Sequence, residues 1–530
     1  MLGQGGMGVV YRAFDPRRGA VVALKTLGAD ARLSVSRFKR EFRSLADAVH
    51  PNLVRLYELA ADGPRWYFTM ELVEGVDFLQ HVRPRSDAAT DYLKLRAALR
   101  QLAEGVSALH ARRILHRDLK PSNVKVASDG RVVLLDFGLA AEIGPDDEHL
   151  SSTPHFCGTM AYMPPEQAAC LPLTPACDWY ALGVMLYEAL TGRLPYSGSL
   201  TTVLRLKQDT DPPSPSSIAA DVPGDLETLC LDLMRRDPSE RPGGREVLDR
   251  LGAANPPAAF APRDTAFVGR EETLQVLRRA FRDARSGRTT AVLVHGASGM
   301  GKSTLVAKFL GEAGADPRAV VLAGRCYESE SVPFKTIDGI VDALAAFLRR
   351  LPRGEADAFL PRDASVLARV FPVFREVAVM AESAARSGET LAPHELRQRA
   401  FDAFRELLGR IGDRRPLVVA LDDLQWGDAD GAARLAELFR PADRPTCLLV
   451  LAYRREDVER SECLQTLQRE WPPGVPRLDA PIDALTREEI ASLAAATLNS
   501  LDPVGDERTR LRLDELAAES QGSPFFVREL

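Results

Sequence analysis

Residues 116–123 of this 530-residue chain read HRDLKPSN, and a run LLDFG follows shortly afterwards. Transfer of a phosphoryl group asks little covalent chemistry of a protein, but it needs a positioned hydroxyl and neutralised charge. Asp118 is the candidate carboxylate that orients or accepts the attacking hydroxyl, and Lys120 can steady the γ-phosphate. Asn123 and Asp136 supply the oxygen ligands that Mg²⁺ prefers. This ordered set of side chains predicts a phosphoryl-transfer site.

A glycine-rich turn lies upstream of this set. Gly3, Gly5 and Gly8 form G-x-G-x-x-G, and Val10 follows them in a β-type context. Glycines allow a hairpin backbone to approach phosphates closely, with its N–H groups facing the anion. By itself the pattern is equally compatible with a turn that binds nothing, so its weight comes from the residues that accompany it.

The run VALK brings a lysine onto a strand near that turn. Lys25 is placed to hold the α- and β-phosphates of a nucleotide, and Ala23 precedes it on the same strand. Glu41 belongs to the amphipathic run SRFKREFRSL and can reach Lys25 to hold it in position. The alternative for this pair is a solvated salt bridge worth under about 1 kcal/mol.

With these motifs, residues 1–252 resemble the eukaryotic-like (Hanks-type) serine/threonine protein kinases. Three further motifs carry the resemblance: GTMAYMPPEQ at 158–167, DWYALG at 178–183 and RDPSERP at 236–242. The resemblance implies a bilobal α+β kinase fold, which agrees with early β-rich runs followed by amphipathic helical stretches. It also implies ATP and Mg²⁺ as cofactors and proteins as substrates.

The resemblance assigns nucleotide contacts to further residues. Met70 is the expected gatekeeper, Glu71 to Val73 form the hinge that binds adenine, and Asp77 approaches the ribose. Lys125 stands where an aliphatic side chain often lies under adenine. Its methylene stem can cover the ring while its ammonium reaches solvent.

Other residues of the resemblance serve the scaffold. Asp178 would brace the catalytic loop from a buried helix, and Glu166 would form an ion pair with Arg241. Pro165 replaces the usual alanine before Glu166, a change that should be tolerated. The resemblance begins almost inside the glycine-rich turn, so we expect a truncated N-terminal strand.

The motifs also indicate a substrate class. Lys120 and Thr159 are typical of the serine/threonine subgroup. Arg117 indicates activation through a phosphorylated loop, because a buried arginine attracts a phosphate. The candidate phosphorylation sites are Ser151, Ser152 and Thr153. The alternative is that SST is only a polar loop.

An Ala- and Pro-rich stretch without periodicity divides the chain. Residues 253–264 have the composition of a semi-rigid linker. They separate a kinase domain at 1–252 from a second domain at 265–530. In the second domain, near-continuous apolar strands alternate with helices, which predicts an α/β domain with a parallel sheet covered on both faces.

The second domain contains HGASGMGKST, which follows an apolar strand and opens a helix, the context that a P-loop requires. Backbone amides and the helix N-terminus would hold phosphates, Lys302 would reach the β- and γ-oxygens, and Ser303 would bind Mg²⁺. The expected nucleotide contacts are Gly296, Gly299, Gly301, Lys302, Ser303 and Thr304.

Acidic and basic residues end the neighbouring strands. The strand in PLVVALDDLQWGD ends in Asp422, the expected acid beside the metal, and Asp423, which is placed to orient water. The strand in TCLLVLAYR ends at Arg454, which can sense a γ-phosphate. A surface ion pair is an equal alternative for Arg454.

Residues 265–530 resemble the AAA-like or STAND signalling ATPases. The motifs are FVGREETLQVL, the P-loop, GRCYESESVPF, DDLQWGD, LAYRRED and ESQGSPFFVREL. The class usually has Gly-Asn-Pro where this chain has Gly522-Ser523-Pro524, and relatives continue into further regions, so a C-terminal truncation is expected. The resemblance also implies self-association through the ATPase domain.

The composition excludes several classes of protein. Apolar residues are 45% and charged residues 27%, and the net charge of -6 gives no reason to expect nucleic acid as a partner. Seven scattered cysteines without a CxxC pair favour reduced thiols in a cytoplasm. No apolar run reaches the roughly 18 residues of a membrane helix. We therefore expect a soluble cytoplasmic protein.

The leading hypothesis is a serine/threonine protein kinase, including autophosphorylation, with a fused P-loop ATPase that acts as a regulatory switch. A signalling scaffold with an inactive kinase fold is the alternative, and the complete set of catalytic residues argues against it. A small-molecule kinase is a third hypothesis, against which the GTMAYMPPE element stands.

Overall fold

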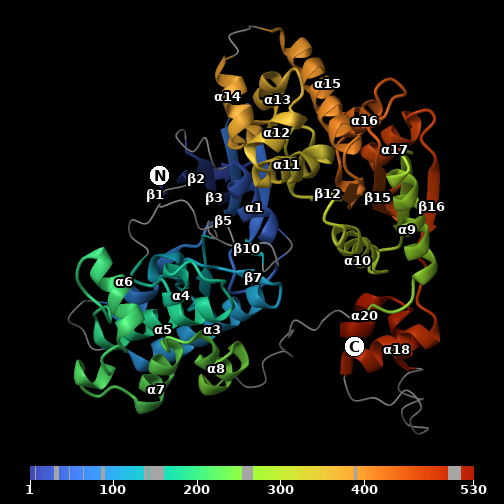
Figure 1. Ribbon diagram of the computed structural model, residues 1–530. Helices are drawn as coiled ribbons and strands as arrows, with labels where there is room; N and C mark the ends of the chain where they lie inside the picture. Colours follow the sequence, from blue (N-terminus) through green and yellow to red (C-terminus); the bar gives the residue numbers. More distant parts are fainter. Residues whose placement is uncertain are drawn as a thin grey trace. The chain divides into compact units, whose positions relative to one another are not determined.

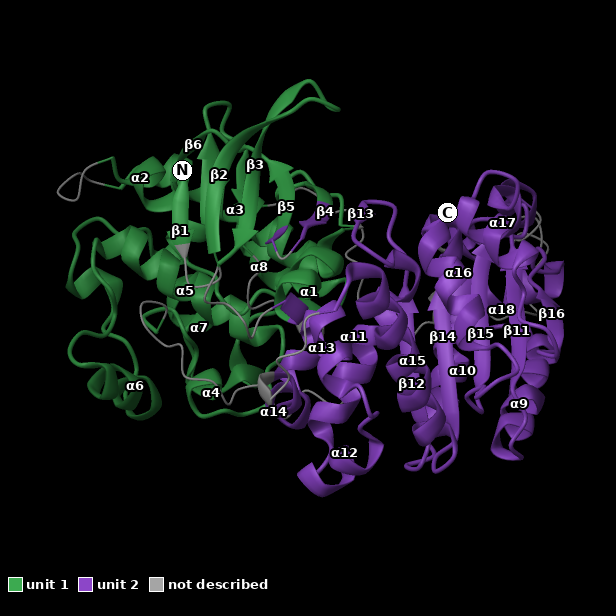
Figure 2. Cartoon of the chain, turned by 90° about the horizontal axis from the view of Figure 1, so that it is seen from above, with its two compact units in different colours: residues 1–28, 37–58, 67–262 green, residues 29–36, 59–66, 263–530 purple. Residues whose placement is uncertain are grey.

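The computed structural model describes residues 1–5, 8–28, 35–46, 48–63, 65–84, 90–136, 141–142, 160–252, 267–386, 391–498 and 515–529. The chain forms two compact units, which are considered separately (Figure 2). The first unit comprises residues 1–28, 37–58 and 67–262, and the second comprises residues 29–36, 59–66 and 263–530.

The first unit begins with an antiparallel sheet of short strands. Its strands are neighbours in the order β1 (Gly3–Gly5), β2 (Gly8–Asp15), β3 (Ala20–Leu27) and β5 (Arg65–Glu71). Strand β4 (Leu56–Asp62) begins in this unit, and its residues from Leu59 onward belong to the second unit. The register places Val10 opposite Lys25 and Ala23 opposite Met70. The expected nucleotide contacts of the glycine-rich turn, of VALK and of the hinge therefore lie on adjacent strands.

Helix α1 (Val35–Leu45) packs on this sheet because its apolar residues recur every three or four positions. Phe38 and Phe42 are fully buried, and their rings lie 4.9 Å and 5.8 Å from the ring of Phe68 on β5. The same helix carries Glu41, one residue before Phe42, so the packing directs that carboxylate toward the sheet.

The helical part of the first unit is built around α3 (Tyr92–His110) and α5 (Ala176–Thr191) (Figure 1). Asp91 caps α3 by accepting hydrogen bonds from the N–H groups of Leu93 and Lys94. Helix α5 is buried on nearly every side, as its apolar sequence WYALGVMLYEAL predicts. The remaining helices are α2 (Phe78–Val82), α4 (Pro165–Ala168), α6 (Leu200–Asp209), α7 (Gly224–Leu233) and α8 (Gly244–Arg250), with the 3₁₀ helices η1 (Pro121–Asn123), η3 (Pro215–Ser217) and η4 (Pro238–Glu240).

Two small sheets carry the loops that hold the expected catalytic residues. Strands β6 (Gly75–Asp77), β8 (Val124–Ala127) and β9 (Val132–Leu134) form one, and β7 (Ile114–Leu115) pairs with β10 (Ala141–Glu142) in the other. Residues 116–123 thus connect β7 to β8, and Asp136 follows β9 by two positions.

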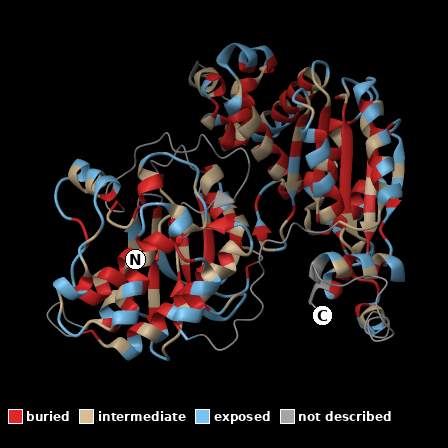
Figure 3. Ribbon diagram, turned by 60° about the horizontal axis from the view of Figure 1, so that its bottom comes forward, coloured by how far each residue is buried: buried red, intermediate tan, exposed pale blue. Residues whose placement is uncertain are grey.

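The second unit contains an all-parallel sheet, as predicted. Its strand order is β12 (Val320–Arg325), β14 (Leu417–Asp422), β15 (Leu448–Arg454), β11 (Thr290–Gly296) and β16 (Arg477–Pro481). Alternate side chains of β14 enter two different cores. Val418 and Ala420 pack with residues of α9 (Glu271–Arg285) and α10 (Lys302–Gly314), whereas Val419 and Leu421 pack with residues of α11 (Lys335–Arg350) and α15 (Pro393–Gly412). Figure 3 shows these strands buried along most of their length.

The second unit contains further elements outside this sheet. They are β13 (Glu330–Ser331), α12 (Arg353–Phe359), α13 (Ala364–Val370), η5 (Pro372–Glu376), α14 (Ala378–Arg386), η6 (Leu424–Trp426), α16 (Ala429–Leu438), η7 (Arg455–Asp457), α17 (Glu462–Arg469), α18 (Arg487–Leu498) and α20 (Pro524–Glu529). None of the helices in the described part of the chain has the length and apolarity needed to cross a bilayer.

The predicted fold class, an α+β unit followed by an α/β unit with a parallel sheet, is confirmed. The exact boundaries of 1–252, 253–264 and 265–530 stay predictions. The expected linker lies outside the described residues.

Candidate functional site

In the first unit, one lysine contacts two carboxylates from distant parts of the sequence. Lys25 Nζ on β3 lies 2.6 Å from Glu41 Oε1 on α1 and 2.7 Å from Asp136 Oδ1. Lys25 and Glu41 are 6% and 4% exposed, so their contact is buried rather than a solvated surface pair. Burial opposes the lysine's charge, but the two carboxylates raise the pKa of Lys25. The pKa of Asp136 is lowered, because the charge of Lys25 outweighs the effect of burial.

The loop between β7 and β8 gathers the remaining expected catalytic residues. Lys120 Nζ lies 2.7 Å from Asp118 Oδ2. Asn123 Nδ2 donates to the backbone oxygen of Asp118 at 2.8 Å and to its Oδ2 at 3.2 Å. The other carboxylate oxygen, Asp118 Oδ1, is buried and accepts no hydrogen bond from any described residue. A buried acceptor without a donor is costly, and it can be satisfied by the hydroxyl of a bound molecule.

The buried carboxylate of Asp178 accepts hydrogen bonds from the backbone of this loop. Asp178 on α5 is 1% exposed and accepts hydrogen bonds from the backbone N–H groups of His116 and Arg117, both at 2.9 Å. Its Oδ2 also lies 2.8 Å from Nε2 of His110. Burial acts against ionisation, but the hydrogen bond and charge of His110 and the backbone N–H of His116 lower the pKa of Asp178. Arg117 has a φ of 63°, and the two backbone bonds stabilise this strained turn.

In the second unit, the turn after β11 has the geometry of a phosphate-binding loop. β11 ends at Gly296, and α10 begins at Lys302. Gly299 and Gly301 have φ values of 76° and 87°, a conformation that favours glycine. Lys302 Nζ donates to the backbone oxygens of Gly296 at 3.0 Å and Ala297 at 2.7 Å. The N–H groups at the start of α10 remain available to an anion.

Two family models match different parts of the chain. The family model described as a protein kinase domain matches residues 1–251, and the one described as an AAA ATPase domain matches residues 266–451. The chain carries a protein kinase domain followed by an AAA ATPase domain.

Several relatives share the kinase domain and are named serine/threonine-protein kinases. The kinase pkn2 of Myxococcus xanthus is 36% identical over 273 residues, which cover 49% of this chain and 32% of pkn2. PkaA of Streptomyces coelicolor is 35% identical over 265 residues, covering 46% of this chain and 47% of PkaA. PrkC of Bacillus subtilis is 33% identical over 248 residues, covering 46% of this chain and 37% of PrkC. The chain spans between about a third and about half of the length of these relatives.

The glycine-rich turn of the kinase domain contains one glycine that the sheet itself requires. A Cβ atom on Gly8 would lie 1.8 Å from the backbone oxygen of Thr26, whereas one on Gly3 would meet nothing within 4 Å. Gly5 pairs with Gly8 in the β1–β2 hairpin. Gly8 is therefore explained by packing between β2 and β3, with or without a nucleotide.

Two acidic residues expected near the nucleotide, Glu71 in the hinge and Asp77 at the ribose, hold basic partners. Arg131 donates to Glu71 Oε2 at 2.8 Å, and Lys125 Nζ lies 2.6 Å from Asp77 Oδ1. The Lys125 ammonium, expected to reach solvent, thus also contacts the residue expected at the ribose. Val73, which lies between the two acids, is partly buried against the core of the helical lobe.

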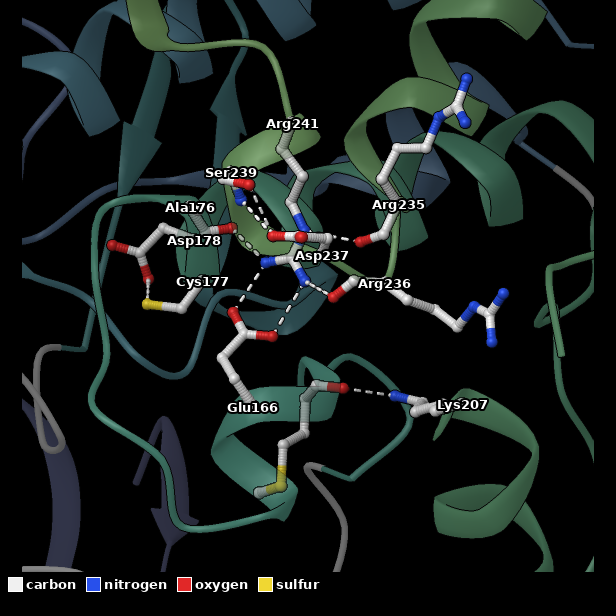
Figure 4. Close-up of polar contacts among 11 residues, drawn as sticks. Glu166, Ala176, Cys177, Asp178, Lys207, Arg235, Arg236, Asp237, Ser239 and Arg241 are labelled. Carbon is white, nitrogen blue, oxygen red and sulfur yellow. Dashed lines mark hydrogen bonds and ion pairs between the residues drawn. The ribbon is translucent and has the colours of Figure 1, made fainter. Parts of the chain in front are cut away.

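The Glu166–Arg241 pair is buried and heavily hydrogen-bonded (Figure 4). Its two hydrogen bonds measure 2.6 Å and 2.8 Å, and the Arg241 side chain is fully buried. The guanidinium also donates to the backbone oxygens of Arg235, Arg236 and Ala176. Pro165 is buried at the start of α4 beside this pair.

Ser151, Ser152, Thr153 and Thr159 lie outside the described residues.

The acids of the ATPase domain lie at the carboxyl end of β14. Burial raises the pKa of Asp422, and a hydrogen bond from Ser303 partly offsets that effect. Ser303 and Thr304 belong to the first turn of α10. Asp422 and Ser303 therefore form one polar pair between the strand and the P-loop helix.

Two residues that the sequence analysis did not single out hold Asp423. Arg325 Nε donates to Asp423 Oδ2 at 2.8 Å, and Gln425 Nε2 donates to its Oδ1 at 2.8 Å. Gln425 also accepts from the backbone N–H of Arg454 at 3.1 Å, and the Arg454 guanidinium lies 5.8 Å from the Trp426 ring. The signal for Arg325 was its place at the end of a strand, in GRCYE.

Two further side chains reach the P-loop backbone. Glu456 Oε1 accepts a hydrogen bond from the N–H of Ser298 at 2.9 Å. Ser523 Oγ donates to the backbone oxygen of Gly299 at 3.2 Å. The Gly-Ser-Pro motif therefore contacts the P-loop through its serine. No local pattern marked Glu456.

Proposed function

We propose that the kinase domain transfers the γ-phosphate of ATP to serine and threonine side chains of proteins, including this chain itself. The observation that carries the proposal is the buried oxygen Asp118 Oδ1, which accepts no hydrogen bond within the described part of the chain and lies next to Lys120 and Asn123. The names of the relatives and the DLKPSN sequence support serine and threonine as acceptors.

Each residue of the kinase site has one task in this reaction. Asp118 orients the acceptor hydroxyl and takes its proton as the hydroxyl oxygen bonds to the γ-phosphorus. The bond between the γ-phosphorus and its bridging oxygen breaks, and ADP leaves. Lys25 binds the α- and β-phosphates, and Lys120 stabilises the negative charge on the transferred group. Glu41 keeps Lys25 in place.

Asn123 and Asp136 fit a bound Mg²⁺, because an amide oxygen and a carboxylate are the donors that this cation takes. Half of the Asp136 side chain is exposed, so a ligand can approach it. Mg²⁺ supplies charge neutralisation for the phosphates when it is bound. In the ATPase domain, the paired Ser303 and Asp422 fit the same cation.

Incorporation of radiolabelled phosphate into the purified chain tests the kinase proposal. Wild type with ATP and Mg²⁺ should label serine or threonine, and Asp118→Asn should lose the label. Asp249→Asn is the matched control, since Asp249 is an exposed residue of α8. A wild type that folds and binds ATP but labels no residue would favour the alternative of an inactive scaffold.

We further propose that the ATPase domain binds ATP through Lys302, orients water through Asp423 and controls the kinase as a nucleotide-dependent switch, with self-association as one route. The fusion of two nucleotide sites in one chain motivates this proposal. Lys302→Ala should change the rate of labelling, whereas the exposed Lys308→Ala on the same helix should not. An unchanged labelling rate and unchanged assembly in Lys302→Ala would reject the switch.

A further inference from the structure

A buried lysine outside the catalytic residues holds part of the segment that leads to Glu166. Lys207 lies on α6 and is 1% exposed. Its ammonium donates to the backbone oxygens of Met160 at 2.8 Å, Ala161 at 2.7 Å and Met163 at 2.6 Å. Figure 4 shows the Lys207 side chain reaching one of these oxygens. All three N–H donors of the ammonium are used by one short stretch of backbone.

A lysine on the surface could not place its ammonium among these three backbone oxygens. Burying a lysine costs free energy, because its charge loses contact with water. Burial lowers the pKa of Lys207 to about 7, yet three acceptors around one nitrogen require the protonated form, which alone has three donors. The Tyr180 ring centroid, 5.6 Å from the ammonium, adds a cation–π contact.

The held segment is tied to the catalytic loop. Gln167, on the short helix that follows the segment, donates through Nε2 to the backbone oxygen of Arg117 at 3.4 Å. Arg117 is the residue immediately before Asp118. On its other side, Tyr162 OH donates to Glu188 Oε2 at 2.5 Å. Residues 160–163 are therefore held by α6 through Lys207 and by α5 through Glu188, and the helix that follows them contacts the loop that carries Asp118.

We propose that Lys207 is a positioning residue for the protein substrate, because it fixes the backbone of residues 160–163 beside the catalytic loop before a peptide binds. The proposal rests on the kinase function proposed above. Lys207 contacts neither Lys25, Asp118 nor Asp136, so its removal should leave ATP binding unchanged. It should weaken the binding of the acceptor peptide, because the surface that receives it would no longer be preformed.

The test uses the full chain and a synthetic serine peptide copied from a site that wild type labels. Lys207→Met keeps the length of the side chain and removes every donor. We expect a rise of about tenfold or more in KM for the peptide, with KM for ATP changed by less than about twofold. Hydrogen exchange of residues 160–163 should be faster. Arg205→Met, an exposed change on the same helix, should alter none of these values.

Three outcomes would overturn the proposal. One is an unchanged peptide KM, and another is an equal change in the KM values for peptide and ATP. If Lys207→Met does not fold, Lys207→Gln replaces it in the test. This variant retains part of the hydrogen-bond donors and should give a smaller rise in peptide KM. The third outcome is that Lys207→Gln gives no rise in peptide KM. A folded wild type without phosphotransfer would reject the proposed kinase function as well, which distinguishes the two failures.

Discussion

The two lysines expected to bind phosphates are equally buried but differ in their direct hydrogen-bond partners. Lys25 in the kinase domain and Lys302 in the ATPase domain are each 6% exposed. Lys25 contacts two carboxylates, which raise its pKa, whereas Lys302 contacts two backbone oxygens and burial lowers its pKa. Lys25 is therefore held by charged partners, and Lys302 by neutral ones.

The difference has a consequence for folding as well as binding. In the kinase domain, Lys25 is one member of a buried charge network, and Glu41 Oε2 has no hydrogen-bond partner among the described residues. Removing one member of a buried pair leaves an uncompensated charge. In the ATPase domain, removing Lys302 leaves the backbone oxygens of Gly296 and Ala297 without this donor, and neither of these groups carries a net charge.

The largest expected effect follows from this contrast. Lys25→Met should lower the free energy of unfolding of the kinase domain by about 3–5 kcal/mol, because Glu41 remains buried without its cation. Lys302→Met should lower that of the ATPase domain by about 1 kcal/mol or less, the scale of ordinary neutral hydrogen bonds. Native-state hydrogen exchange of the full chain reads the two domains separately.

The double variant Lys25→Met with Glu41→Met is the control for the kinase domain. It should recover most of the lost stability, since replacing both members of a buried pair by apolar side chains is often neutral. If Lys25→Met and Lys302→Met lower the free energy of unfolding of their domains equally, the carboxylates around Lys25 do not distinguish the two sites.

Whether a site residue could be predicted depends on whether a local sequence motif marks it. Local motifs identified Lys25, Asp118 and Lys302, because the chemistry of a phosphate site constrains neighbouring residues in the sequence. Apolar patterns predicted a β-rich part followed by a helical part in the first domain, and the parallel sheet of the second domain. The helices between β12 and β14, residues 335–412, carried no motif and were not predicted.

The missed side chains share a different property. Arg325 and Asp423 are 98 positions apart, Glu456 and Ser298 are 158 apart, and Lys207 and Met160 are 47 apart. Each pair meets only because strands or helices far apart in the chain pack together. A single sequence records the residue types of such pairs but not their proximity, so only the tertiary structure reveals them.

A second, smaller effect is expected on the affinity of the ATPase domain for ATP. Glu456 places a carboxylate on the Ser298 N–H, within the loop expected to hold phosphate. Glu456→Gln should raise the affinity of the ATPase domain for ATP by about tenfold, since a negative charge near the phosphates is removed. Calorimetric titration of the full chain measures this affinity. Glu459→Gln, an exposed change nearby, is the control, and a fall in affinity would instead indicate that Glu456 helps to hold the nucleotide or its metal.

The smallest expected effect concerns the contact between the Gly-Ser-Pro motif and the P-loop. Ser523 Oγ donates one neutral hydrogen bond to Gly299, and such a bond contributes about 1 kcal/mol. Ser523→Ala should therefore increase hydrogen exchange in α20 by about fivefold, while Ser492→Ala on α18 should not affect it. Ser523→Asn keeps a side-chain donor and should exchange at nearly the wild-type rate. If Asn and Ala accelerate exchange equally, the serine acts through its small size against Gly299, where a Cβ would lie 2.9 Å from its hydroxyl, and not through its hydrogen bond.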